Sequence, residues 1–141
     1  MVRVIAIDLG KVRTGLAISD KNEFLASPIG VIEERNRDEL IKKILLIIDE
    51  YETEEIVIGL PKNMNGTEGD SAINAREFAN KLSNYVNIPI IMRDERVTTV
   101  SAHNYLNTTN TRGKKRKYIV DSVAAVIILQ DYLDFKRNKI N

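Results

Sequence analysis

The start of the chain contains two short apolar runs that are separated by a polar turn. Residues 2–7 are rich in valine and isoleucine and end at Asp8, and residues 16–18 resume the apolar pattern up to Ser19. This pattern predicts two strands that are joined by a turn over residues 10–13. Because the first strand is apolar on both faces, we expect helices to cover both sides of it.

The rest of the chain alternates between strand-like and helix-like apolar spacing. Strands are predicted at residues 26–32, 56–58 and 88–92, and helices at residues 37–50, 71–84, 98–106 and 116–134. Pro28 places its strand toward an edge of the sheet, and Asn36 with Glu39 resembles a capping box. The order of elements implies an α/β domain with a mixed sheet, which starts as an antiparallel meander and continues with helix-connected parallel strands.

Length and composition narrow the class of protein. The 141 residues suffice for one domain over residues 1–141 and are too few for two. The absence of cysteine excludes disulfides and thiolate metal sites. No apolar run approaches the ~20 residues that span a membrane, and Asp8 interrupts the first run too early for a signal peptide, so we expect a cytoplasmic protein without a membrane partner. With a formal net charge of +1, any nucleic-acid binding must arise from local clusters.

Asp8 is the first candidate functional residue. It stands where a buried strand ends, which is the usual place of a ligand site in an open α/β sheet. Gly10 would let a backbone or a ligand approach closely. The alternative is an ordinary turn-forming aspartate, and two further carboxylates in comparable settings weigh against it.

Asp121 is the second carboxylate. Its three- and four-residue spacing to Ala124, Ala125 and Ile128 places it on the apolar face of the last predicted helix. A carboxylate that points toward the sheet needs a cation, a metal or several hydrogen-bond donors. The alternative is a first-turn acid that interacts favourably with the helix dipole.

Glu95 is the third carboxylate and follows the predicted strand at residues 88–92. It is either a surface ion-pair partner of Arg93 or Arg96, or a ligand at the carboxyl edge of the sheet. Together with the two aspartates it would offer three hard oxygen ligands, which favour Mg²⁺ or Mn²⁺ over zinc. His103, the only histidine, is predicted to lie on a helix surface and not to be a ligand.

Five cations crowd six positions around the start of the last predicted helix, at Arg112 and residues 114–117. Lysine and arginine at a helix amino terminus oppose the helix dipole, so the run does not help folding. It would help binding if a phosphate backbone lay across that end of the helix. A solvated basic loop is the alternative, and the position of the run just before Asp121 favours phosphate binding.

These residues together resemble the YqgF (RuvX) family, nucleases of the ribonuclease-H-like superfamily. The resemblance rests on four segments that span nearly the whole chain, namely residues 8–20, residues 59–61 with Gly66 and Gly69, residues 94–99 and residues 121–125. Thr14 and Val97 stand where other aliphatic residues are more usual in the family. Neither departure touches the acidic residues.

The resemblance implies a ribonuclease-H-like fold, with a five-stranded mixed sheet in the order 3-2-1-4-5 that is flanked by helices on both faces. It implies that Asp8, Glu95 and Asp121 form a catalytic, metal-binding site for Mg²⁺ or Mn²⁺. Nucleic-acid contacts would come from Arg13, Lys62 and Arg96 near the metals, and from Lys114, Lys115 and Lys117 further along the strand.

The implied activity is metal-dependent endonucleolytic hydrolysis of phosphodiester bonds. The favoured role is processing of the 5′ end of precursor 16S ribosomal RNA by a monomer or weak homodimer. The alternatives are resolution of four-way DNA (Holliday) junctions in recombination, which needs a dimer, and a non-catalytic nucleic-acid-binding module. Asp8 and Gly10 also resemble the first phosphate loop of actin-like kinases, but those proteins enclose ATP between two such domains.

Overall fold

The computed structural model describes the backbone of residues 3–94 and 113–140, and the side chains of residues 3–94 and 123–138. The strands are β1 (Arg3–Asp8), β2 (Arg13–Ser19), β3 (Ala26–Glu33), β4 (Thr53–Leu60) and β5 (Ile90–Asp94). The helices are α1 (Arg37–Glu50), α2 (Asp70–Ser83) and α4 (Gly113–Ile140). The helix predicted at residues 98–106 lies outside the described residues.

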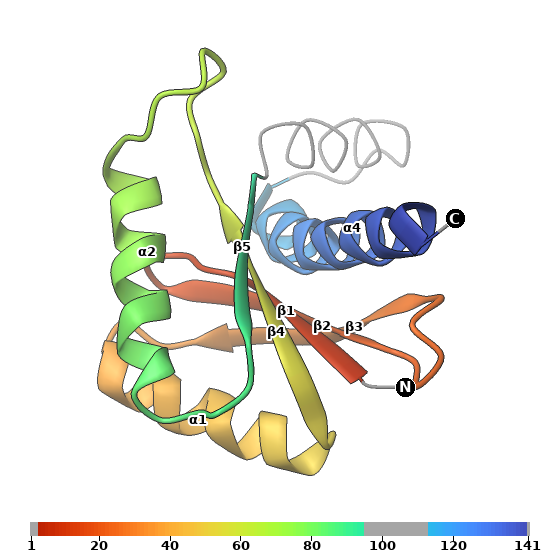
Figure 1. Cartoon of the computed structure of the whole chain (residues 1–141). Coiled ribbons are helices and arrows are strands. Elements are labelled where there is room, and N and C mark those ends of the chain that lie inside the picture. Colours follow the sequence, from red (N-terminus) through yellow and green to blue (C-terminus); the bar gives the residue numbers. More distant parts are fainter. Residues whose placement is uncertain (1–2, 95–112, 141) are drawn as a thin grey trace.

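The strands form one mixed sheet in the order β3-β2-β1-β4-β5, which confirms the predicted sheet. β1 pairs antiparallel with β2, and β2 with β3, whereas β1, β4 and β5 run parallel. Figure 1 shows α1 and α2 on one side of the sheet and α4 on the other. Because β1, β4 and β5 run parallel, all three strands start at one edge of the sheet and end at the opposite edge. We call these the amino edge and the carboxyl edge.

The alternating side chains of β1 divide the core into two layers. Ile5 and Ile7 pack with α1, α2 and the matching face of β4, whereas Val4 and Ala6 pack against α4. All four side chains are fully buried. This explains why the strand is apolar on both faces.

The structure corrects several predicted boundaries. β4 is longer than predicted, at Thr53–Leu60, because it pairs with β1 from Thr53 onward and with β5 as far as Leu60. β5 begins at Ile90, since Pro89 lacks an N–H and contributes only its carbonyl, which accepts a 2.9 Å bond from the Ile56 N–H. α4 extends beyond the predicted range at both ends, so residues 114–117 of the cation run form part of the helix.

The predicted cap of α1 forms differently from a full capping box. The Asn36 side chain accepts the Glu39 N–H at 3.0 Å, as predicted. The N–H of Asn36 donates instead to a carboxylate oxygen of Glu34, at 3.2 Å. The prediction that Pro28 marks an edge strand is confirmed, because β3 is the outermost strand on its side.

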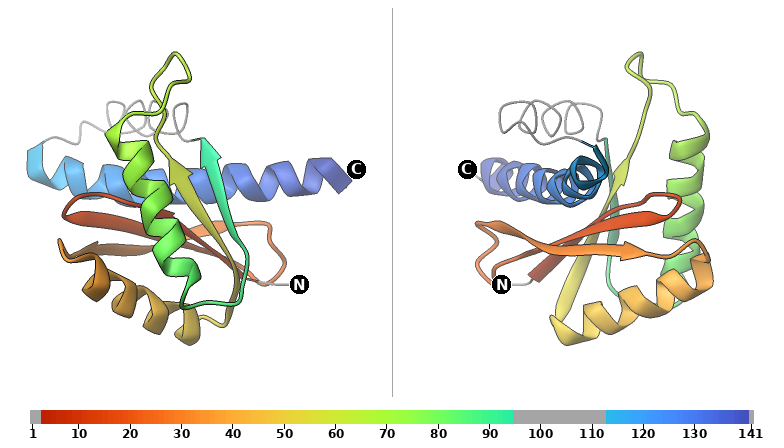
Figure 2. Two further views of the ribbon diagram at one scale, coloured as in Figure 1. Left: turned by 60° about the vertical axis from the view of Figure 1, so that its left-hand side comes forward. Right: turned by 180° about the vertical axis from the view of Figure 1, so that it is seen from behind.

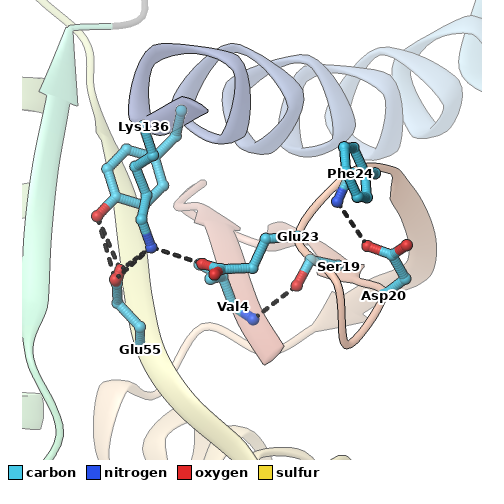
Figure 3. Close-up of polar contacts among 8 residues, drawn as sticks. Val4, Ser19, Asp20, Glu23, Phe24, Glu55 and Lys136 are labelled. Carbon is cyan, nitrogen blue, oxygen red and sulfur yellow. Dashed lines mark hydrogen bonds and ion pairs between the residues drawn. The ribbon is translucent and has the colours of Figure 1, made fainter. Parts of the chain in front are cut away.

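A buried polar network fixes the carboxyl-terminal half of α4 at the amino edge (Figure 3). Tyr132 donates to both carboxylate oxygens of Glu55 at 2.8 and 3.1 Å. Lys136 donates to Glu55 at 3.1 Å and to Glu23 at 2.6 Å. Since Glu55 lies on β4 and Glu23 in the β2–β3 turn, one helix is tied to two distant parts of the chain.

No helix in the described part of the chain has the length and apolar character needed to cross a membrane.

Candidate metal and nucleic-acid site

Asp8 ends β1 at the carboxyl edge, as predicted, with a half-buried side chain opposite Gly15 of β2. The parallel register brings the ends of β4 and β5 to the same edge, where Leu60 pairs with Asp94. Glu95 directly follows Asp94 in the sequence. The topology therefore brings β1 and the end of β5 to one edge, separated only by β4.

The turn after Asp8 is shaped by close backbone contacts. A Cβ atom at Gly10 would lie 2.1 Å from the carbonyl oxygen of Arg13, so only glycine fits this position without a shift of backbone. The Gly10 N–H donates to the buried Thr14 hydroxyl at 3.4 Å, and Arg37 donates to the Gly10 carbonyl at 2.9 Å. Side chains from β2 and α1 therefore both hydrogen-bond to the backbone of this turn.

Arg37 is a residue that sequence reasoning missed. It is the first residue of α1, where a cation opposes the helix dipole, and that mismatch is the signal that could have identified it. Burial lowers the pKa of Arg37 from its ordinary value. Thr14, which departs from the family's usual residues, likewise has a structural reason, because its hydroxyl accepts the Gly10 N–H.

The length of α4 places Asp121 relative to Asp8. At the amino edge, Val4 pairs in register with Glu55, which Tyr132 contacts. α4 runs in the opposite direction to β1, so the residues that precede Tyr132 lie progressively nearer to the carboxyl edge (Figure 2). Asp121 precedes Tyr132 by eleven positions, or roughly 16 Å of helix. Asp8 lies roughly 13 Å beyond Val4 along β1. The backbone of Asp121 therefore reaches the level of Asp8.

The predicted apolar face of α4 is confirmed around Asp121. Ala124, Ala125 and Ile128 are buried against the sheet, with exposures of 3% or less. The side chain of Asp121 itself lies outside the described residues, as do Glu95, Arg96 and His103. Among the side chains that the structure describes, no group of three histidine, cysteine, aspartate or glutamate residues could hold a metal.

The predicted nucleic-acid contacts are distributed around the carboxyl edge. Arg13 begins β2, which runs antiparallel to β1 and so starts at this edge. Lys62 lies two residues beyond the end of β4. The first turns of α4 contain the backbone of Lys114, Lys115 and Lys117, which is roughly 6 to 10 Å nearer to the helix amino terminus than that of Asp121.

The described part of this edge fits a hard divalent cation. Asp8 offers hard carboxylate oxygens at the end of β1, and the tight turn that follows it requires glycine at position 10. Mg²⁺ is commonly bound by one or two protein carboxylates together with substrate phosphates. Asp8, with Asp121 at its level on α4, agrees with that pattern.

Comparison with known proteins adds sequence relatives over nearly the full length. A family model described as "RuvX: Holliday junction resolvase" matches residues 2–135. A protein of Geobacillus sp. (strain WCH70), named "Putative pre-16S rRNA nuclease", is 43% identical over 96% of this chain and 100% of its own length. A protein of the same name from Clostridium botulinum (strain Alaska E43 / Type E3) is 45% identical over 94% of this chain and 97% of its own.

Solved structures share the fold at low sequence identity. T. thermophilus RuvC in complex with a Holliday junction substrate superposes with a TM-score of 0.63 and 11% identity, covering 98% of this chain and 97% of its own. The Fowlpox virus resolvase, in a complex with Holliday junction DNA, gives a TM-score of 0.54 and 13% identity, covering 96% of this chain and 99% of its own. These likenesses confirm the predicted ribonuclease-H-like fold class.

Proposed function

This chain belongs to the RuvX family, and we propose that it is a metal-dependent nuclease that processes the 5′ end of precursor 16S ribosomal RNA. One observation carries the proposal of an active site at the carboxyl edge. The antiparallel course of α4 brings the backbone of Asp121 level with Asp8, and β5 ends at the same edge with Asp94, the residue before Glu95 in the sequence. Three carboxylates from distant parts of the chain would not gather there for folding, because they repel one another unless a cation is present.

Asp8, Glu95 and Asp121 would hold Mg²⁺ or Mn²⁺. When bound, such an ion supplies Lewis acidity toward the scissile phosphate and lowers the pKa of water. Asp8 is oriented by the rigid β1–β2 turn, whose backbone is fixed by Thr14 and Arg37. The core packing fixes the positions of β1 and α4, and these elements carry the proposed ligands Asp8 and Asp121.

The cations would bind the phosphate backbone on either side of the metal. Arg13 begins β2 and Lys62 follows the end of β4 at the carboxyl edge, and Arg96 comes two positions after the end of β5 in the sequence. Lys114, Lys115 and Lys117 would extend the positive charge along the start of α4. Contacts of this kind fix the register of the nucleic acid without reading its sequence. We therefore expect recognition by shape and backbone.

Precursor ribosomal RNA is the favoured substrate because relatives that are similar over nearly their whole length carry that name. The second candidate is a four-way DNA junction, which the description of the family model favours. Symmetric cutting of a junction needs two active sites related by a two-fold axis, and therefore a dimer. An RNA-processing nuclease can act as a monomer.

A side-by-side cleavage assay tests this proposal. Purified protein is incubated with Mg²⁺, with Mn²⁺ or with a chelator, and is offered either precursor 16S ribosomal RNA with its 5′ leader or a synthetic four-way DNA junction. We expect metal-dependent cleavage within the leader of the RNA. The Asp8→Asn variant serves as the control for contaminating nucleases.

Paired symmetric cuts in the junction, with the RNA left intact, would replace RNA processing by junction resolution. Cleavage of neither substrate, together with the absence of metal binding in calorimetry, would favour the non-catalytic binding module. Cleavage of either substrate at an undiminished rate in the chelator would contradict the metal-dependent mechanism.

A further inference from the structure

A cleft lies at the amino edge, away from the candidate active site. It has a volume of about 420 Å³ and is formed by the end of α1, the start of β4 and the segment between α2 and β5. Apolar side chains form one part of its wall, and two carboxylates and a hydroxyl form another. The lining residues are Leu45, Ile48, Asp49, Glu52, Thr53, Tyr85, Val86, Asn87 and Ile88.

The segment that borders this cleft is strongly acidic. Residues 49–55 contain five carboxylates and no cation. Glu55 is neutralised by Lys136, but among the described residues no ion pair involves Asp49, Glu50, Glu52 or Glu54. We call these four residues the acidic ridge. In a chain with a formal net charge of +1, this is an uncompensated concentration of negative charge.

Asp49 and Glu50 lie in the last turn of α1, where the helix dipole makes negative charge more unfavourable. The last turn of α1 contains no basic residue, although a helix carboxyl terminus favours cations. Arg3 donates to the Tyr51 carbonyl at 3.4 Å and offsets part of this charge. Glu52 has a φ of 51°, a left-handed conformation at a helix end where glycine or asparagine is usual. Folding alone would favour other residues here.

Thr53 supplies an independent sign of a missing ligand. Thr53 lines the cleft and is 7% exposed, and its hydroxyl oxygen, which is itself buried, has no hydrogen-bond partner among the described residues. A β-bulge between Arg3 and Val4 pairs Thr53 with Arg3, so that Thr53 faces the α1 side of the sheet. A buried polar atom without a partner destabilises the fold, and a bound hydrogen-bond donor would remove that cost.

We propose that this cleft binds an arginine or lysine side chain from a basic segment of a partner protein, with the acidic ridge holding neighbouring cations of the same segment. Leu45, Ile48 and Val86 would contact the aliphatic stem. The ring of Tyr85, which is 58% exposed, would contact the cation. Asp49 and Glu52 would form ion pairs with it, and Thr53 would accept a hydrogen bond.

The position of the cleft favours a protein over a nucleic acid as the occupant. Phosphate groups would be repelled by the acidic ridge, whereas basic RNA-binding proteins carry the complementary charge. The cleft lies at the edge opposite to Asp8, so a partner could dock while the carboxyl edge remains open to substrate. The proposal does not depend on nuclease activity.

A peptide-binding measurement tests the proposal. The probe is a fluorescein-labelled peptide of Gly-Arg-Ser repeats, and the control peptide carries neutral citrulline in place of each arginine. We expect the arginine peptide to bind the full chain and the citrulline peptide not to bind. In the double variant Asp49→Asn, Glu52→Gln, we expect affinity to fall by about tenfold or more. Glu77→Gln removes an exposed carboxylate on α2 and should leave affinity unchanged.

Thr53→Val separates binding from folding. Because the hydroxyl has no partner in the free protein, the melting temperature should stay the same or rise, whereas the affinity for the arginine peptide should fall. A melting temperature that falls together with affinity would contradict the role given to Thr53. The affinity of the double variant would then be the test of whether the cleft binds the peptide.

Three results would overturn the proposal. Equal binding of the two peptides would exclude charge recognition. Equal losses in the double variant and in Glu77→Gln would indicate attraction to the overall charge and no specific cleft. Self-association in sedimentation experiments that the double variant abolishes would make a second copy of this chain the occupant.

Discussion

Two carboxylates on neighbouring parallel strands of the same sheet have different surroundings. Glu55, near the start of β4, is held by the hydroxyl of Tyr132 and the ammonium of Lys136 (Figure 3). Asp8, at the end of β1, stands beside a turn whose close contacts shape the backbone, and the family pattern adds further acids to its edge. The chain supplies the partners of Glu55 itself, whereas we propose that a metal ion completes the surroundings of Asp8.

This difference shows why an inward-facing carboxylate is not by itself a functional residue. Glu55 avoids the cost of an isolated buried charge through contacts within the chain, and the proposed metal would give Asp8 a counter-charge from outside the chain. Removing a partner of Glu55 should therefore affect stability first. Removing Asp8 should affect activity first.

Asp8→Asn is expected to have the largest effect. Loss of a charged metal ligand removes several kcal/mol of transition-state stabilisation, which slows cleavage by about a thousandfold or more. Single-turnover cleavage of precursor ribosomal RNA at saturating Mg²⁺ measures this loss, and circular dichroism checks the fold. Asp49→Asn, the same change at the opposite edge, is the matched control and should cleave normally.

The stability of the same variant sharpens the comparison. In a chelator, Asp8→Asn should be as stable as the parent chain or more stable, because one of several repelling carboxylates has become neutral. Mg²⁺ should raise the melting temperature of the parent chain more than that of the variant. Unchanged turnover in Asp8→Asn would remove the basis for distinguishing the two edges.

The sequence predicts those features that follow from local apolar patterns or from the family motifs. The continuous apolar run of β1 predicted a strand buried on both faces, and the family motifs predicted the strand order; the structure confirms both. Asp8 was identified because a polar residue interrupts an apolar run. The role of Glu95 as a ligand stays a prediction, since that residue lies outside the described residues.

Other features could not be predicted because they depend on contacts between distant segments. Glu55 looks like one acid in an acidic run, and only the packing of α4 reveals that Tyr132 and Lys136 surround it. The bond from Arg37 to the Gly10 carbonyl joins residues 27 positions apart. Helix and strand periodicity carries no information about such pairs.

Lys136→Met tests the amino edge and should have the second largest effect. The substitution keeps much of the aliphatic stem and removes the ammonium that neutralises Glu55 and Glu23. Leaving a largely buried carboxylate without its cation should lower the free energy of unfolding by about 3 kcal/mol. Denaturant titration measures this loss. Cleavage by the folded variant should stay close to normal, and a selective loss of activity would show that the two edges are coupled.

Tyr132→Phe should have a smaller effect, which depends on pH. Burial and then the hydrogen bond to Glu55 raise the pKa of Tyr132. Burial lowers the pKa of Lys136, but its hydrogen bonds to Glu23 and Glu55 outweigh this, so that pKa is also raised. Both groups therefore stabilise the fold fully below their unfolded pKa values of about 10, and this stability is lost as pH rises through the folded values.

At neutral pH, we expect Tyr132→Phe to lower the free energy of unfolding by about 2 kcal/mol, as for loss of one hydrogen bond to a carboxylate. Above a pH of about 10, the parent chain should lose stability more steeply than the variant, because the variant has no phenol to titrate. Melting temperatures measured across this range provide the test. Parallel curves for the two proteins would show that Tyr132 does not contribute to the pH dependence.

The smallest expected effect concerns the start of α4, at the carboxyl edge. If Lys114 and Lys115 each neutralise one phosphate, replacing both by alanine should flatten the dependence of log affinity on log salt. The change should be roughly 1.4 for single strands and roughly 1.8 for a duplex. Lys42 and Lys43 are the matched control, because they are also adjacent lysines on a helix, but they pair with Glu39 and Glu34 within the chain. Their double alanine variant should keep the parent slope. If both double variants flatten the slope equally, the run at residues 114–117 contributes only general positive charge, and the carboxyl edge loses its distinct role in binding.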